Sequence, residues 1–147
     1  MICADLRELP SLVPAGSFSC CVSNPPYFID ALKCPDEQRC TARHAGNLNY
    51  DLLFHRSASL LEEQGVVSII IPAEAEKTVV DTAWNHKLFP LHRVQVFTKP
   101  GKPCRRVLLN FGFEAKECRE EKLCIEVNHN EFTPEYVALT KDFYLKM

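Results

Sequence analysis

Two short apolar runs in this chain of 147 residues each end abruptly at proline. Residues 18–23 stop at the pair Pro25 and Pro26, and residues 66–71 stop at Pro72. Because proline cannot donate a backbone hydrogen bond, such runs are typical of buried strands with fixed ends. We therefore expect two parallel strands, and the residues after the first strand should lie at the carboxyl edge of the sheet, where open α/β folds bind ligands.

Two further segments have the spacing of helices. Residues 49–64 carry apolar side chains three and four positions apart, and Gly65 follows where a left-handed residue would end the helix. Residues 73–86 show a similar pattern. The order strand, helix, strand, helix predicts an α/β fold with a parallel sheet and helical crossovers.

The second half of the chain has a different pattern. Residues 92–98 and 105–113 are rich in β-forming residues, and the turn between them, residues 99–103, contains two prolines and a glycine. This combination predicts an antiparallel hairpin that finishes the parallel sheet.

The two ends of the chain give weaker signals. Residues 123–127 predict a further short strand, and Thr133 followed by Pro134 predicts the first residues of a closing helix. Residues 1–5 resemble the end of a buried strand whose preceding strands are absent. Such a sheet would have an open edge, so we expect a tendency to self-association.

Composition fits one globular domain over residues 1–147, with 46% hydrophobic and 24% charged residues. The net charge is −2, so contact with nucleic acid must come from a local basic patch. The eight cysteines include no C-x-x-C pair, and no signal peptide opens the chain. We expect free thiols in a cytoplasmic protein without a metal site. No apolar run is long enough to span a membrane.

The residues with the clearest chemistry are Asn24, Pro25, Pro26 and Tyr27. Methylating an exocyclic amine requires acceptors for both of its N–H bonds, so that its lone pair can face the methyl donor. The Asn24 side chain offers one carbonyl and the next main-chain carbonyl offers another, while the prolines hold the backbone rigid. Tyr27 offers a ring for stacking on a base. The alternative is a rigid turn that ends a strand, with a core tyrosine.

The chain resembles the Asn-Pro-Pro-Tyr class of Rossmann-like methyltransferases, and more closely the bacterial valine-tRNA adenine-37 N6-methyltransferase family. The matching segments cover almost the whole chain: residues 23–28, 41–44, 71–73, 96–103, 106–109, 132–136 and 141–147. The proline motif indicates the class, and the hairpin and the C-terminal segment indicate the narrower family.

The resemblance implies S-adenosyl-L-methionine as cofactor and an adenine of tRNA as substrate. Asn24 and Pro25 would hold the target amine, Tyr27 would stack on the base, and Asn24 would also lie beside the cofactor. Asp5 and Leu6 match a segment near the cofactor adenine, although Asp5 also reads as a solvated acid at a strand end. The family's glycine-rich cofactor loop has no counterpart here, so we expect an incomplete methyltransferase that binds the cofactor weakly on its own.

Basic residues are candidates for contact with RNA. Arg39, Arg43 and His44 follow the proline motif, and Phe28 would extend the ring of Tyr27. The hairpin contributes a second group, which consists of Lys99, Lys102, Arg105 and Arg106. Together these residues could track RNA phosphates, although a charged turn is more often simply solvated.

Two other functions remain open. A glutamine N5-methyltransferase acting on protein would use the same acceptors, since an amide nitrogen presents the same two N–H bonds. A non-catalytic RNA-binding module would explain the missing glycine-rich loop.

Overall fold

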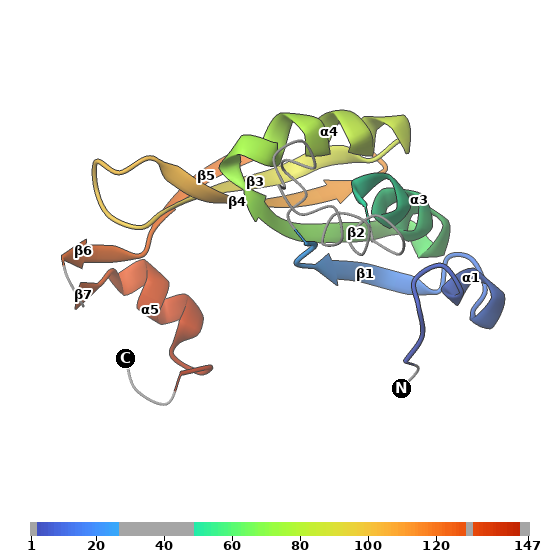
Figure 1. The fold of residues 1–147 in the computed structure, drawn as a ribbon, viewed down its shortest axis with the longest axis horizontal. Helices are drawn as coiled ribbons and strands as arrows, with labels where there is room; N and C mark the ends of the chain where they lie inside the picture. The colour runs from blue at the N-terminus through green and yellow to red at the C-terminus, as the bar shows by residue number, and fades with distance from the viewer. Residues whose placement is uncertain (1–2, 27–48, 129–130, 145–147) are drawn as a thin grey trace, which may run out of the picture.

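The computed structural model describes residues 3–26, 49–128 and 131–144 (Figure 1). The helical elements are α1 (Leu9–Leu12), α3 (Tyr50–Leu60), the short 3-10 helix η1 (Ala73–Ala75), α4 (Glu76–Asn85) and α5 (Pro134–Thr140). The strands are β1 (Phe18–Ser23), β2 (Leu61–Pro72), β3 (Phe89–Phe97), β4 (Cys104–Gly112), β5 (Arg119–Cys124), β6 (Glu126–Asn128) and β7 (Glu131–Phe132).

The main sheet has the order β1-β2-β4-β3-β5. β1 is parallel to β2 and β3 is parallel to β5, whereas β4 is antiparallel to both of its neighbours. β1, β2, β3 and β5 therefore all run in the same direction. The expected α/β fold, a parallel sheet that ends in an antiparallel hairpin, is confirmed, and β4 lies between β2 and β3.

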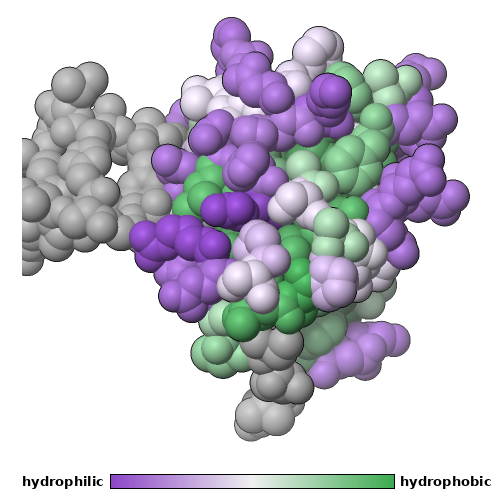
Figure 2. Space-filling model, turned by 90° about the vertical axis from the view of Figure 1, so that its right-hand side faces the viewer, coloured by the Kyte–Doolittle hydropathy of each residue, from purple (hydrophilic) through white to green (hydrophobic). Residues whose placement is uncertain are grey.

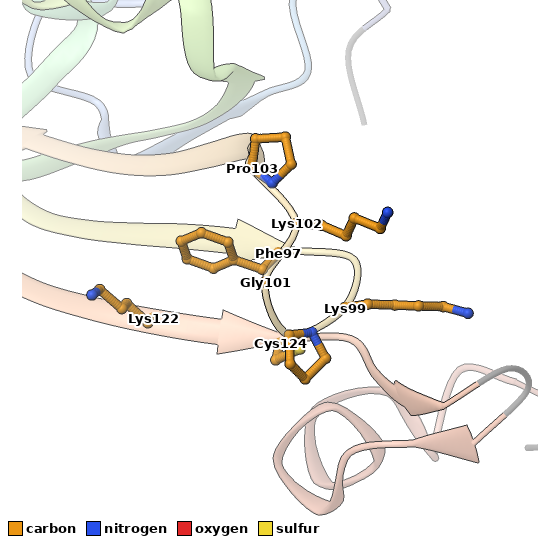
Figure 3. Close-up of a pocket in the computed structure, with 8 residues that line it drawn as sticks. Phe97, Lys99, Gly101, Lys102, Pro103, Lys122 and Cys124 are labelled. Atoms are coloured by element: carbon orange, nitrogen blue, oxygen red, sulfur yellow. The ribbon is translucent and has the colours of Figure 1, made fainter.

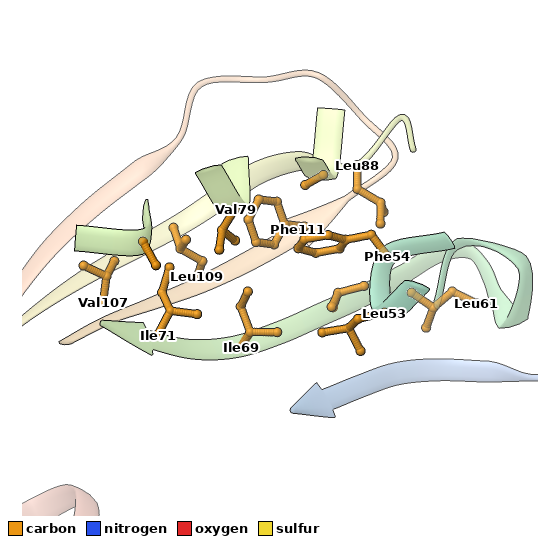
Figure 4. Packing of buried hydrophobic residues seen from close by; sticks show 13 residues of the cluster. Leu53, Phe54, Leu61, Ile69, Ile71, Val79, Leu88, Val107, Leu109 and Phe111 are labelled. Atoms are coloured by element: carbon orange, nitrogen blue, oxygen red, sulfur yellow. The ribbon is translucent and has the colours of Figure 1, made fainter. Parts of the chain in front are cut away.

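The core lies between the sheet and the helices α3 and α4, which cover one of its faces (Figures 1 and 4). Every second residue of β2 and β4 points into this layer, as a half-covered sheet requires. Phe54 of α3 meets Phe111 of β4 edge to face, with ring centroids 5.1 Å apart. The fully or almost fully buried side chains of the cluster include Leu53, Phe54, Val67, Ile69, Ile71, Val79, Leu88, Val107, Leu109 and Phe111.

The first long helix is shorter than predicted. α3 begins at Tyr50, where the Asn49 side chain caps it by accepting a hydrogen bond from the Leu52 amide, and it ends at Leu60. Gly65 lies within β2 and has no positive φ, so its predicted role as a left-handed helix end was wrong. A Cβ atom at Gly65 would lie 2.8 Å from Cβ of Leu61 and 2.9 Å from the Glu62 carbonyl oxygen. Glycine is needed here for close backbone approach.

The N-terminal part also differs from expectation. β1 is parallel as predicted but largely exposed, with Val22 80% accessible, because it is the edge strand of the sheet that the structure describes. The described part of residues 1–5 forms no strand. Instead, the Asp5 carbonyl accepts hydrogen bonds from the amides of Glu8 and Leu9, which starts the turn into α1.

The C-terminal predictions are confirmed with different bounds. The predicted strand over residues 123–127 is divided between β5 and β6, and β6 pairs with β7 in a separate small sheet. Thr133 caps α5 by accepting a hydrogen bond from the Tyr136 amide. β6, β7 and α5 form what we call the C-terminal arm. Its first residues continue the sheet, since the Ile125 amide donates to the Phe97 carbonyl and the Glu126 amide to that of Thr98.

Two general expectations can be compared with the described residues. The cysteines among them, Cys3, Cys20, Cys21, Cys104, Cys118 and Cys124, form no disulfide with one another. Within the same residues, no helix combines the length and the apolar character needed to cross a bilayer.

Candidate active site

The carboxyl ends of β1, β2 and β3 meet at one edge of the sheet because these strands run in the same direction. Asn24, Pro25 and Pro26 follow β1 directly at this edge. Ser23, the last residue of β1, pairs with Ile69, so Asn24 leaves the sheet beside the end of β2. The predicted position of the motif is therefore confirmed for its first three residues.

Asn24 and Pro25 have different environments. Asn24 is exposed, whereas Pro25 is buried and Pro26 is exposed again. The buried proline ring anchors a backbone whose φ is already fixed, and the exposed asparagine stands at the edge where a ligand can reach it. This arrangement can present two carbonyl acceptors with little reorganisation. Tyr27, Phe28, Arg39, Arg43 and His44 lie outside the described residues.

Asp5 is held by its own neighbour. Its carboxylate accepts hydrogen bonds from the Arg7 amide at 2.8 Å and from the Arg7 guanidinium at 2.9 and 2.6 Å. These bonds keep the pKa of Asp5 well below its usual range. Leu6 is half-buried and packs against the core. Figure 1 shows this N-terminal segment and α1 beside the start of β1, whereas Asn24 follows its end. The cofactor role of Asp5 and Leu6 stays a prediction.

The basic residues of the hairpin lie at the same edge as Asn24. Lys99 and Lys102 belong to the turn between β3 and β4, and Arg106 of β4 pairs with Pro72, the last residue of β2. Arg105 is exposed beside it. The structure thus brings the predicted basic group to the carboxyl edge, as a surface for phosphates would require.

A hollow beneath the turn brings in a residue that the sequence did not single out. This hollow of about 720 Å³ lies between the β3–β4 turn and β5, and Lys122 of β5 lines it together with Phe97, Lys99 and Lys102 (Figure 3). Lys122 was missed because its place depends on the parallel pairing of β3 with β5, in which Gln95 faces Lys122. A local pattern gives no signal for such a long-range register.

Solved structures define the class of fold. A predicted O-methyltransferase from Agrobacterium tumefaciens superimposes with a TM-score of 0.66 over 91% of this chain and 56% of that protein, at 15% sequence identity. A candidate DNA modification methylase from Thermus thermophilus matches with a TM-score of 0.51 over 91% of this chain and 57% of that protein, at 16% identity. The fold is that of Rossmann-like methyltransferases.

Sequence relatives are more specific. The chain is 42% identical over its full length to the tRNA1(Val) (adenine(37)-N6)-methyltransferase of Bacteroides fragilis, and it spans 62% of that protein. It is 41% identical over 97% of its length to the protein of the same name from Phocaeicola vulgatus, of which it spans 61%. No protein-family model matches the chain. The chain is therefore a relative of these methyltransferases, as its motifs predicted, and spans about three fifths of their length.

Proposed function

We propose that this chain supplies the part of an S-adenosylmethionine-dependent N6-adenine methyltransferase that holds the target amine, and that its substrate is an adenine in cytoplasmic tRNA. One observation carries the proposal: Asn24 and Pro25 follow β1 directly at the carboxyl edge of the sheet. Asn24 is exposed there and Pro25 is buried. The name of the 42% identical relative, a tRNA1(Val) (adenine(37)-N6)-methyltransferase, supports the choice of tRNA.

In the proposed reaction, bound S-adenosylmethionine would supply the methyl group of its sulfonium: the S–CH₃ bond breaks as the N–CH₃ bond forms, and the amine releases one proton to solvent. The side-chain carbonyl of Asn24 accepts one N–H of the adenine amine, and the main-chain carbonyl of Pro25 accepts the other. Both acceptors pull the nitrogen's hydrogens away from the ring plane, so its lone pair becomes free to face the methyl group. The buried ring of Pro25 keeps the acceptors in place. By its place in the motif, Tyr27 would stack on the base.

The described residues fit one wall of a cofactor site. Asn24 is exposed at the edge where Rossmann-like folds bind ligands. Its polar side chain suits the charged amino acid group of S-adenosylmethionine. Asp5 fits less directly, because its two carboxylate oxygens already accept hydrogen bonds from Arg7. For Asp5 to bind a cofactor hydroxyl or amine, it would have to exchange at least one of these bonds.

Methyl transfer to two substrates tests the function. A protein with the full length of the relatives is incubated with labelled S-adenosylmethionine and either a valine tRNA transcript or a protein substrate with an accessible glutamine. We expect label in the tRNA as N6-methyladenine, and none when the target adenine is replaced by guanine. Label on the glutamine side chain would instead show the N5-methyltransferase that the same acceptors permit. Salt-dependent RNA binding without any transfer would show a binding module.

We also propose that copies of this chain associate through β1. Its edge presents unpaired backbone groups in the described structure, and Val22 beside them is 80% exposed. Light scattering of the 147-residue chain should show a mass that rises with concentration. Val22→Lys should reduce this rise, because a lysine on an edge strand disfavours pairing. Leu139→Lys, at an exposed position of helix α5, adds the same charge away from any strand edge and is the control, which should leave the rise unchanged.

A further inference from the structure

The hollow beneath the β3–β4 turn has an apolar floor and a cationic rim. Phe97, Pro100, Pro103 and Cys124 supply the apolar part. Figure 3 shows Lys99 and Lys102 extending to one side of the turn and Lys122 to the other, with the ring of Phe97 between them. A flat apolar face between two cations is complementary to a nucleotide, which has a flat base and a phosphate on either side.

The lysines around the hollow do not have the same charge environment. Lys99 forms an ion pair with Glu126 at 3.2 Å, and both side chains are only partly exposed. Among the described residues, Lys102 and Lys122 have no ion-pair partner. The positive charge that an incoming anion meets therefore comes from Lys102 and Lys122, whereas Glu126 offsets that of Lys99.

The hollow is also held in shape before any ligand arrives. Pro100 and Pro103 restrict the turn, which is closed by a hydrogen bond from the Lys102 amide to the Lys99 carbonyl at 3.2 Å. Gly101 adopts a φ of 72°, which few other residues tolerate. On the opposite wall, the Ile125 amide bonds to the Phe97 carbonyl at 2.9 Å. A preformed site loses little conformational entropy on binding.

We propose that this hollow binds one nucleotide of a single-stranded RNA segment, with its base on Phe97 and its two flanking phosphates on Lys102 and Lys122. Lys99 acts differently: its ion pair with Glu126 ties the turn to the C-terminal arm. The assignment of RNA rests on the proposed function. The hollow and Asn24 lie at the same carboxyl edge of the sheet, the hollow beside β5 and Asn24 after β1, so a tRNA strand that runs along this edge can reach both.

Salt dependence of RNA binding tests the two cations. Binding of an RNA stem-loop to the chain is measured over a range of salt concentrations for Lys102→Gln, Lys122→Gln and the double variant. The slope of log affinity against log salt is negative. Each single variant should make it less steep by about 0.7, the value for one phosphate contact on a single strand. The double variant should bind on the order of tenfold more weakly at low salt. Lys77→Gln, on the exposed side of α4, should behave like the wild type. Unchanged slopes in both single variants would overturn the proposal.

Substitutions of the ring test the stacking contact. Phe97→Leu should weaken binding on the order of tenfold, and Phe97→Tyr should restore it, since base stacking needs an aromatic face. An RNA without a base at the bound position should bind the wild type as weakly as it binds Phe97→Leu. If that RNA binds the wild type as tightly as the intact one, the hollow holds no base and the proposal fails.

Glu126 provides the third test. Glu126→Gln should free Lys99 and increase RNA affinity and its salt slope, whereas Glu135→Gln, which removes the same charge elsewhere on the C-terminal arm, should change neither. All of these measurements record binding and not methyl transfer. A protein that transfers no methyl group but shows the expected binding pattern would refute the proposed function and support the nucleotide site. Equal binding to anionic lipid vesicles, lost in the same variants, would overturn RNA as the ligand.

Discussion

Asn24→Ala in a protein of the relatives' full length should lower the turnover number by about 10²- to 10³-fold, the usual loss when a preorganised polar group at a reaction centre is removed. The physical reason is the amine itself. Its lone pair is delocalised into the adenine ring, and the Asn24 carbonyl is one of two acceptors that hold its N–H bonds as the electrons turn towards the methyl group. The hydrogen bond from the amine to the Asn24 carbonyl strengthens as the reaction proceeds, so the loss should appear in kcat more than in KM.

Single-turnover kinetics and an RNA binding assay together check this prediction. RNA affinity should fall only modestly, because phosphate contacts supply most of it. Asn85→Ala, which removes an exposed asparagine at the end of α4, is the matched control and should keep full activity. A turnover number close to that of the wild type in Asn24→Ala would remove the basis of the proposed function.

Phe111→Ala should destabilise the chain by about 3–5 kcal/mol, the usual range for truncating a large buried side chain. Phe111 is completely buried near the end of β4, the central strand of the sheet, and packs edge to face against Phe54 of α3 (Figure 4). Its removal leaves a cavity between the sheet and its helix layer, which the rigid surroundings can fill only in part. Chemical denaturation followed by circular dichroism measures the change in free energy of unfolding.

Leu108→Ala gives the control from the same strand. Leu108 lies on the other face of β4 and is 38% exposed, so its truncation should cost roughly 1 kcal/mol or less. Phe111→Leu keeps much of the volume and should be intermediate, which preserves a readable transition if the alanine variant does not fold. Equal losses for Phe111→Ala and Leu108→Ala would contradict the layered core.

Local patterns predicted most of the elements. Three signals act over a few residues: the prolines that end β1 and β2, the apolar spacing of α3 and α4, and the pair Thr133-Pro134 that starts α5. Each prediction is confirmed in kind. The antiparallel hairpin was equally local, since its turn residues lie between its two strands.

Long-range features were not visible in the same way. Nothing in the residues of β4 indicates that it inserts between β2 and β3, because strand order depends on packing of the whole sheet. The prediction that Gly65 ends a helix was wrong for a related reason. Its close contact with Leu61 and Glu62 arises only when the chain turns from α3 into β2. Exposure of β1 also depends on which elements lie beside it.

The candidate site shows the same division. Asn24 and Pro25 could be predicted because a short continuous segment determines both their chemistry and their position after a strand. Lys122 could not, because only the pairing of β3 with β5 brings it to the hollow beside Phe97. The Arg7 partner of Asp5 is close in sequence, but its side-chain geometry is known only from the fold.

Because β4 lies in the middle of the sheet, the inner strands should resist local unfolding more than the edge strands. Among the strands that the structure describes, β2, β4 and β3 are hydrogen-bonded on both sides, whereas β1 and β5 are each bonded to one neighbour. Brief local unfolding therefore begins at the margins, and amide hydrogen exchange should be slowest in the middle of the ladder. The β3–β4 turn is anchored by these protected strands, whereas the acceptors after β1 depend on the buried ring of Pro25 to stay in place.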